Sequence, residues 1–158
     1  MSIRIGQGID FHRLEKDLNL WLGGILIPSE KGCVAHSDGD VLLHALCDAI
    51  LGAAGMRDIG YYYPDSNPAY KGIDSKILLG KTFDLIKSAG FSIVNADATI
   101  CLEKPKISPY IGEMKSVISS ILETIPENIS IKATTTEKLG FTGREEGIMA
   151  AAVVLLSR

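Results

Sequence analysis

The chain has 158 residues and a formal net charge of −3, and 46% of its residues are hydrophobic while 22% are charged. These proportions exclude disordered and fibrous proteins and predict a single compact domain over residues 1–158. The negative charge argues against non-specific binding to nucleic acid, and no apolar stretch reaches the roughly 20 residues that span a bilayer.

Hydrophobic periodicity and turn residues divide the chain into short strands and helices. Gly23-Gly24 separates two apolar runs and predicts a hairpin near the N-terminus. Ser37 or Asp38 is placed to cap the first helix, and Ser108-Pro109 opens the third. Strands are predicted over 3–12, 18–22, 25–28, 91–103, 129–135 and 147–156, and helices over 39–54, 74–88 and 108–123.

The remaining segments, 29–38 and 55–73, are expected to be loops. The second is rich in glycine and proline, and an irregular stretch of that length in a small domain is usually functional. Because strands and helices alternate after an initial hairpin, the predicted fold is α+β. We expect a mixed β-sheet with helices packed on one face plus an N-terminal β-hairpin.

The cysteines and the N-terminus indicate the compartment. Cys33, Cys47 and Cys101 contain no Cys-x-x-Cys pair, which favours buried, reduced thiols. The first residues lead directly into a strand pattern, with no signal peptide before it. We therefore expect a soluble cytoplasmic protein that has no membrane or nucleic-acid partner.

Two of the three histidines are candidates for a metal site. Asp10 and His12 are two apart in a predicted strand and would project from the same face, where His44 of the first helix could reach them. Two imidazoles and a carboxylate suit a zinc ion with an open fourth position. The alternatives are a solvated strand end for the first pair and a hydrogen-bonded core histidine for His44. Gly6 and Gly8 indicate close backbone approach beside this strand.

The first helix also carries an unusual polar stripe. It is apolar on most of its circumference, yet Asp40, His44 and Asp48 follow one another at intervals of four residues. Buried carboxylates are costly unless they are paired. We therefore expect Asp40 or Asp48 to hydrogen-bond to His44 and orient its ring.

A second polar segment, residues 132–144, is a candidate phosphate site. It contains three successive threonines, the cations Lys132, Lys138 and Arg144, and Glu137, a hard oxygen ligand suited to Mg²⁺. An ordinary threonine-rich strand is the alternative.

Two shorter segments also admit two interpretations. His36-Ser37 is either an anion site at a helix N-terminus or an ordinary cap, and 104–106 is either a nucleotide pocket or a solvated turn. The sequence contains no phosphate-binding loop of the Walker type and no dinucleotide fingerprint.

Taken in order, five blocks resemble the 2-C-methyl-D-erythritol 2,4-cyclodiphosphate synthase family of the non-mevalonate isoprenoid pathway. They are residues 8–12, 35–41, 58–60, 64–65 and 133–144, and the resemblance covers essentially the whole chain. It implies conversion of 4-diphosphocytidyl-2-C-methyl-D-erythritol 2-phosphate to the cyclic diphosphate with release of CMP. It also implies a homotrimer with active sites between subunits.

The resemblance further implies roles for individual residues. Asp10, His12 and His44 would hold zinc, and Glu137 would help to place a second divalent cation, Mg²⁺ or Mn²⁺. His36 and Thr135 match positions that act on the reacting phosphates. The implied substrate contacts are Asp10, His12, His36, Ser37, Asp58, Ile59, Gly60, Asp65, Leu102, Lys104, Pro105, Lys106, Ala133, Thr134, Thr135, Thr136, Glu137, Phe141 and Arg144.

Two other functions use the same residues. A metal-dependent phosphohydrolase would activate water at the zinc and give a linear product. A structural zinc protein or a nucleotide-binding module would have no catalytic role, and a structural site would be closed by a fourth protein ligand. The sequence offers no obvious fourth ligand.

Overall fold

The computed structural model describes residues 2–158, and seven strands form within them. These are β1 (Ile3–Lys16), β2 (Leu20–Leu22), β3 (Ile25–Ile27), β4 (Lys31–Val34), β5 (Ser92–Cys101), β6 (Ile129–Thr134) and β7 (Gly147–Ser157). Five of them form a sheet in the order β4-β1-β7-β5-β6, and β2 pairs with β3 in a separate hairpin. Since β5 and β6 run parallel and the other neighbours antiparallel, the sheet is mixed, as predicted.

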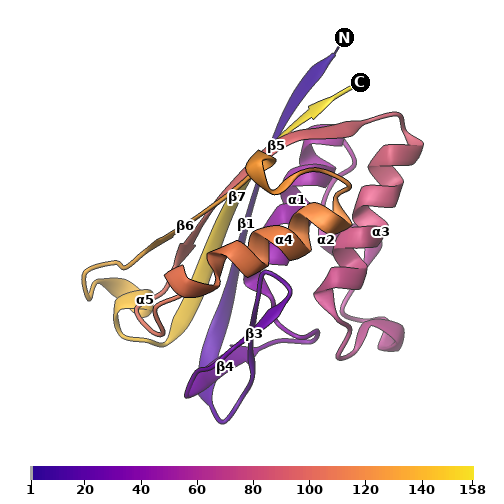
Figure 1. The fold of residues 1–158 in the computed structure, drawn as a ribbon. Coiled ribbons are helices and arrows are strands. Elements are labelled where there is room, and N and C mark those ends of the chain that lie inside the picture. Colours follow the sequence, from indigo (N-terminus) through magenta and orange to yellow (C-terminus); the bar gives the residue numbers. More distant parts are fainter. Residues whose placement is uncertain (1) are drawn as a thin grey trace.

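Most of the helices lie together alongside this sheet; they are α1 (Val41–Ala54), α2 (Ile59–Tyr62), α3 (Ser75–Ser88) and α4 (Ile111–Ile121) (Figure 1). The short helix α5 (Gly140–Gly143), between β6 and β7, lies apart from them. Single 3₁₀ turns form at Pro68–Tyr70, Ser108–Tyr110 and Pro126–Asn128. Alternate residues of the central strands, such as Ala98 and Ala152, are buried on the face that α1 covers. The predicted α+β fold with helices on one face is confirmed. Among the described residues, no helix is long and apolar enough to cross a membrane.

The opposite face of the sheet is open in the single chain. Ile5, Phe11 and Val153 lie on it with 72%, 55% and 40% of their surface exposed. Exposed apolar residues that cluster on one sheet face are a mark of an interaction surface. This apolar face is therefore a candidate surface for contact with another chain.

Two glycines of β1 allow α1 to lie directly on the sheet. A Cβ built on Gly8 would lie 2.0 Å from the carbonyl oxygen of Ala45, and one built on Gly6 would lie 2.0 Å from that of Ala49. Real Cβ atoms essentially never approach another atom within 3.0 Å, so any side chain here would push the helix away. The predicted close backbone approach is confirmed.

The cap of α1 differs from the prediction. Asp40, and not Ser37 or Asp38, is the N-cap, and its Oδ1 accepts from Leu43 N at 3.0 Å. The same carboxylate accepts from Gly23 N and Gly24 N of the hairpin turn at 3.0 and 2.7 Å. Burial raises the pKa of Asp40, although the three N–H groups favour its charged form. Asp40 thus ties the hairpin to the start of α1.

Several boundaries also differ. β1 continues to Lys16 because its last four residues pair with β4, a strand inside the predicted loop 29–38. The predicted loop 55–73 contains α2 and a 3₁₀ turn, and α4 begins only after the turn Ser108–Tyr110. The unpredicted elements β4, α2 and the 3₁₀ turns are three or four residues long, too short to show a hydrophobic period.

Candidate metal and phosphate site

Asp10, His12 and His44 present three ligand atoms to one point. Asp10 Oδ2 lies 3.0 Å from both His12 Nε2 and His44 Nδ1, and the two nitrogens are 3.2 Å apart. Tetrahedral zinc with bonds of about 2.0–2.1 Å needs ligand atoms about 3.3 Å apart. The three atoms, called the ligand triangle below, therefore fit one face of a tetrahedron and leave the fourth corner free. Among the described residues, no other histidine, cysteine or carboxylate joins them.

Strand β1 and helix α1 together position the ligand triangle. Alternation along β1 turns Asp10 and His12 toward α1, while Phe11 between them faces outward. His44 lies in the first turn and a half of α1, which Gly8 admits close to the strand. The convergence predicted from strand and helix periodicity is confirmed.

The electrostatics of the ligand triangle favour a bound cation. Burial opposes ionisation of Asp10, but hydrogen bonds and positive charge from His12 and His44 outweigh it and hold the pKa of Asp10 well below its usual range. Burial also disfavours protonation of His44, yet the adjacent Asp10 carboxylate raises the net pKa of that imidazole. A divalent metal would replace the protons that these groups otherwise share.

The outer nitrogen of His44 has partners that the sequence did not predict. Nε2 lies 2.9 Å from Ser75 Oγ and 3.2 Å from Ser37 Oγ. The expected supports have other partners: Asp48 accepts from Ile59 N at 2.7 Å, and Asp40 holds the hairpin turn. The expectation that Asp40 or Asp48 hydrogen-bonds to His44 is therefore wrong, because neither carboxylate contacts its ring.

A cavity of about 360 Å³ opens over the ligand triangle. His36 lines it, and its buried Nε2 has no hydrogen-bond partner in the described part of the chain. A buried polar atom without a hydrogen bond is costly unless a ligand pairs with it. The cavity brings together five further predicted positions, which are His36, Ser37, Ile59, Gly60 and Asp65. Asp58 instead caps α2, accepting from Tyr61 N at 2.9 Å.

The threonine–glutamate segment forms an ordered loop after β6. Thr135 Oγ1 donates to Glu137 Oε1 at 2.7 Å, and Glu137 adopts a left-handed φ of 52°. Glu103 accepts from Thr136 N at 3.2 Å and from Lys138 Nζ at 2.9 Å. Glu103 was not singled out from the sequence, and its side chain fixes the conformation of this loop.

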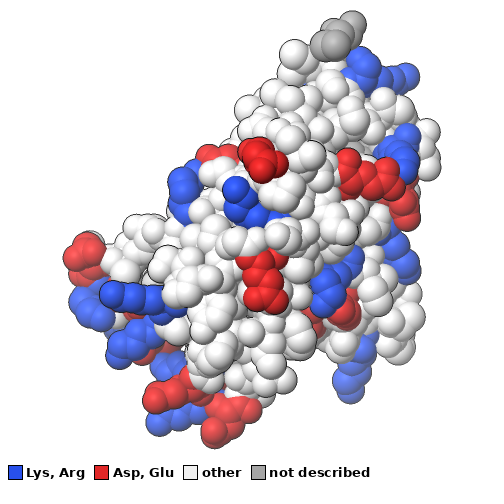
Figure 2. Space-filling model, viewed as in Figure 1, with Lys and Arg blue, Asp and Glu red and all other residues white. Residues whose placement is uncertain are grey.

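The cations of this segment are paired within the chain. Lys132 contacts Asp97, Lys138 contacts Glu103, and Arg144 pairs with Glu146 at 3.0 Å. Figure 2 shows the same pattern more widely, with basic and acidic side chains interspersed on the visible face. The expected cationic cradle is therefore neutralised in the single chain.

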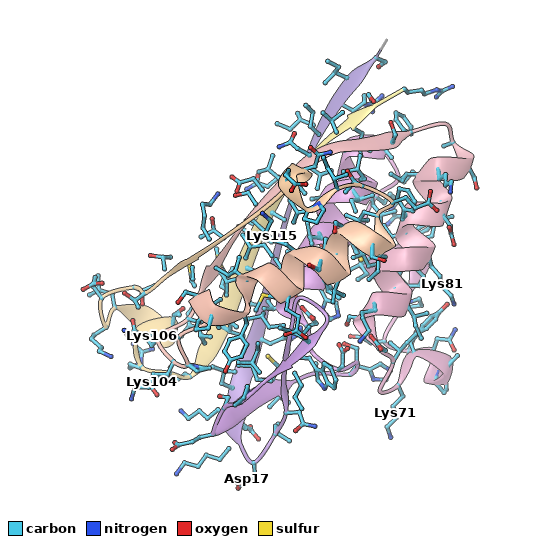
Figure 3. All side chains as sticks on the ribbon, in the orientation of Figure 1. Asp17, Lys71, Lys81, Lys104, Lys106 and Lys115 are labelled. Carbon is cyan, nitrogen blue, oxygen red and sulfur yellow. The ribbon has the colours of Figure 1, made fainter. Side chains whose placement is uncertain are left out.

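The remaining predicted positions do not line the cavity over the ligand triangle. In the described chain, none of the residues lining its cavity comes from 102–108 or 133–144. Lys104 and Pro105 instead line a second cavity of about 340 Å³. Figure 3 shows Lys104 and Lys106 near α5, at the opposite edge of the molecule from Lys81 on α3. Phe141 stacks edge-on against Phe11, with ring centres 6.0 Å apart.

Known sequences are similar to this chain along almost its whole length. The model of the YgbB family matches residues 3–157. The 2-C-methyl-D-erythritol 2,4-cyclodiphosphate synthase of Bacteroides fragilis is 58% identical over 158 residues, which cover 100% of this chain and 99% of that protein. The synthase of the same name from Porphyromonas gingivalis is 56% identical over 153 residues, which cover 97% of this chain and 94% of that protein.

Solved structures show the same similarity. A 2C-methyl-D-erythritol-2,4-cyclodiphosphate synthase in its CDP-bound form has a TM-score of 0.90 and 38% identity. The match covers 98% of this chain and 100% of that protein. A CDP complex of IspF from Plasmodium falciparum has a TM-score of 0.86 and 36% identity, with 98% and 96% covered. The bifunctional IspDF of Campylobacter jejuni has a TM-score of 0.94 and 42% identity. The match covers 98% of this chain but only 42% of that longer protein.

Proposed function

The chain belongs to the YgbB family, and 2-C-methyl-D-erythritol 2,4-cyclodiphosphate synthases match it along almost their whole length. We infer that it catalyses the same cyclisation. The observation that carries this inference is the ligand triangle, whose free corner opens into a cavity lined by five further family positions. Family membership alone leaves open which residues act, and the geometry supports a specific assignment.

The proposed substrate is 4-diphosphocytidyl-2-C-methyl-D-erythritol 2-phosphate. An oxygen of its 2-phosphate attacks the β-phosphorus, and the bond from that phosphorus to the oxygen bridging the α-phosphorus breaks. CMP leaves with the bonding electrons, so the products are the cyclic diphosphate and CMP. Because the substrate attacks itself, no protein nucleophile is required, and the chain acts as a phosphorus–oxygen lyase by positioning and charge stabilisation.

The residues around the first cavity would hold the phosphates in the bent shape that cyclisation needs. Asp10, His12 and His44 would bind a zinc ion, which supplies Lewis acidity and a template for the diphosphate. The unpartnered Nε2 of His36 would donate to a phosphate oxygen, and Ser37 Oγ lies at the same rim. Ile59, Gly60 and Asp65 would enclose the methylerythritol part.

The loop after β6 would serve the nucleotide end. Glu137 would help to hold a second divalent cation, Mg²⁺ or Mn²⁺, which neutralises charge on the leaving CMP. Thr135 shares a hydrogen bond with Glu137 and would contact the same phosphates. The cytidine would lie against Ala133, Thr134, Thr136 and the segment Leu102, Lys104, Pro105 and Lys106, with Phe141 and Arg144 nearby.

We propose that these two halves come from different subunits of a homotrimer. The metal half and the nucleotide half do not line a common cavity in the described chain, which supports a site completed by a second copy. The uncovered apolar face of β1 and β7, which includes Ile5 and Phe11, supplies surface for such an assembly. The fourth position of the tetrahedron, which no described protein ligand fills, also argues against a purely structural zinc site.

Phosphorus NMR of the reaction products tests this function. The protein, supplied with zinc and magnesium, should convert the substrate to CMP and a species with two coupled phosphorus signals from one cyclic diphosphate. A phosphohydrolase would instead consume water and give a linear product. Exclusive formation of linear products by the metal-loaded protein would overturn the proposal.

A further inference from the structure

We propose that Ser75 and Asp38 are positioning residues that fix the ring of His44, so that its Nδ1 faces the ligand triangle with a free lone pair. The inference rests on the proposed metal-binding role of that triangle and extends it to two residues outside it. Ser75 at the start of α3 and Asp38 in the loop before α1 would thus contribute to metal binding without contacting the metal.

The contacts form a chain that leads away from the ligand triangle. His44 Nε2 lies 2.9 Å from Ser75 Oγ, and Ser75 Oγ in turn donates to Asp38 Oδ1. The backbone N–H of Ser75 donates to the other oxygen, Asp38 Oδ2, at 2.9 Å. Ser75 is fully buried, so water does not compete for its hydroxyl.

Asp38 is itself held in place. Its N–H donates to the carbonyl of Ile73 at 3.1 Å, and its Oδ1 also accepts from Asp40 N at 3.1 Å. The carboxylate thus joins the loop before α1 to the start of α3. Because these anchors are backbone groups, the carboxylate presents its oxygens to Ser75 in a defined direction.

Donor and acceptor chemistry sets the tautomer of His44. A carboxylate has only acceptors, so the single hydroxyl hydrogen of Ser75 points to Asp38. The lone pair left on Ser75 Oγ must accept from His44 Nε2, which therefore carries the hydrogen. A neutral imidazole has one such hydrogen, and Nδ1, 3.0 Å from Asp10 Oδ2, is left with the lone pair that a metal requires.

A purely structural explanation accounts poorly for the Ser75 hydroxyl. Helix α3 is already capped by Asp74, whose side chain accepts from Lys76 N at 2.8 Å. Ser37 Oγ is the other hydroxyl near His44 Nε2, at 3.2 Å, and it accepts from Gly39 N. Because Nε2 carries a hydrogen in this arrangement, the Ser37 hydroxyl cannot donate to it, and the hydroxyl hydrogen stays available to the substrate.

Metal affinity measured without turnover tests the positioning role of Ser75 and Asp38. We expect Ser75→Ala to weaken zinc binding by about 10–100-fold in competition with a chelator, as loss of an outer hydrogen bond to a ligand histidine typically does. The absorption spectrum of the cobalt-substituted protein should change as well. Asp38→Asn should weaken binding similarly, whereas Ser75→Thr, which keeps the hydroxyl, should restore affinity to within about threefold of the unmodified chain.

Thr82→Val is the matched control, because Thr82 is a second buried hydroxyl of α3 and has no hydrogen-bond partner in the described chain. It should bind zinc like the unmodified protein. If Asp38→Asn does not fold, Ser75→Ala and Ser75→Thr decide the matter. Unaltered zinc affinity and an unaltered cobalt spectrum in folded Ser75→Ala would overturn the positioning role of Ser75 and leave the proposed function intact. Failure of the unmodified protein to bind zinc would overturn both.

Discussion

Replacing His44 with alanine is expected to lower zinc affinity and the rate of cyclisation each by more than about 10³-fold. The substitution removes one of three ligand atoms from the ligand triangle, and the remaining Asp10 and His12 define only an edge of the tetrahedron. Lewis-acid stabilisation of developing charge contributes several kcal/mol, and each 1.36 kcal/mol changes a rate about tenfold. Zinc content after dialysis and product formation under saturating substrate measure the two effects.

Two further variants separate the metal from other parts of the site. His36→Ala should lose activity but keep zinc, because His36 lines the cavity outside the ligand triangle. Glu113→Gln, on the exposed surface of α4, should change neither property. Normal turnover by zinc-free His44→Ala would show that the metal is not needed.

Gly8→Ala is expected to destabilise the fold by about 3 kcal/mol, the upper range for overpacking a close contact. The added Cβ would lie 2.0 Å from Ala45 O and 2.7 Å from Ala49 N, both backbone atoms of α1 that no rotamer change can move. The helix would have to shift and carry His44 away from Asp10. We therefore expect a melting temperature lower by roughly 10 °C and loss of zinc binding.

Gly112→Ala provides the matched control for this substitution. Gly112 lies in α4, and nothing approaches its built Cβ within 4 Å. Alanine favours helix over glycine by about 0.5–1 kcal/mol, so this variant should be as stable as the unmodified chain or slightly more so. A Gly8→Ala protein with unchanged melting temperature and zinc affinity would contradict the close packing of β1 on α1.

Local periodicity was enough to predict the convergence of Asp10, His12 and His44. The two-residue period of β1 places Asp10 and His12 on one face, and the pattern of α1 identifies His44 as a polar residue on a buried helix. Gly6 and Gly8 marked the contact between these two elements. Each of these signals depends on neighbours within a few residues, which is the range over which sequence patterns are reliable.

The supports of His44 could not be predicted in the same way. Asp40 and Asp48 share a helix stripe with His44, but the cap of α1 and the start of α2 take up their carboxylates. The contact between Ser75 and Asp38 spans 37 positions and exists only once α3 packs beside α1. Helix spacing shows which residues are neighbours on one helix and carries no information on partners from another.

The charges of the second segment illustrate the same limit. Lys132 and Lys138 were expected to attract phosphate, yet each pairs with a carboxylate 35 positions away. The pairing of Lys132 with Asp97 depends on the register of the parallel strands β5 and β6, which the sequence does not specify. In the proposed site, phosphate binding would therefore depend on metal ions, hydroxyl groups and His36 rather than on these lysines.

Diffraction at the zinc absorption edge, from crystals grown with zinc and CDP, tests the central claim most directly. We predict an anomalous peak about 2.0–2.1 Å from Asp10 Oδ2, His12 Nε2 and His44 Nδ1, with a phosphate oxygen of the nucleotide as fourth ligand. A peak elsewhere, or a fourth ligand from a protein side chain, would contradict the proposal that these three residues hold a metal for phosphate chemistry.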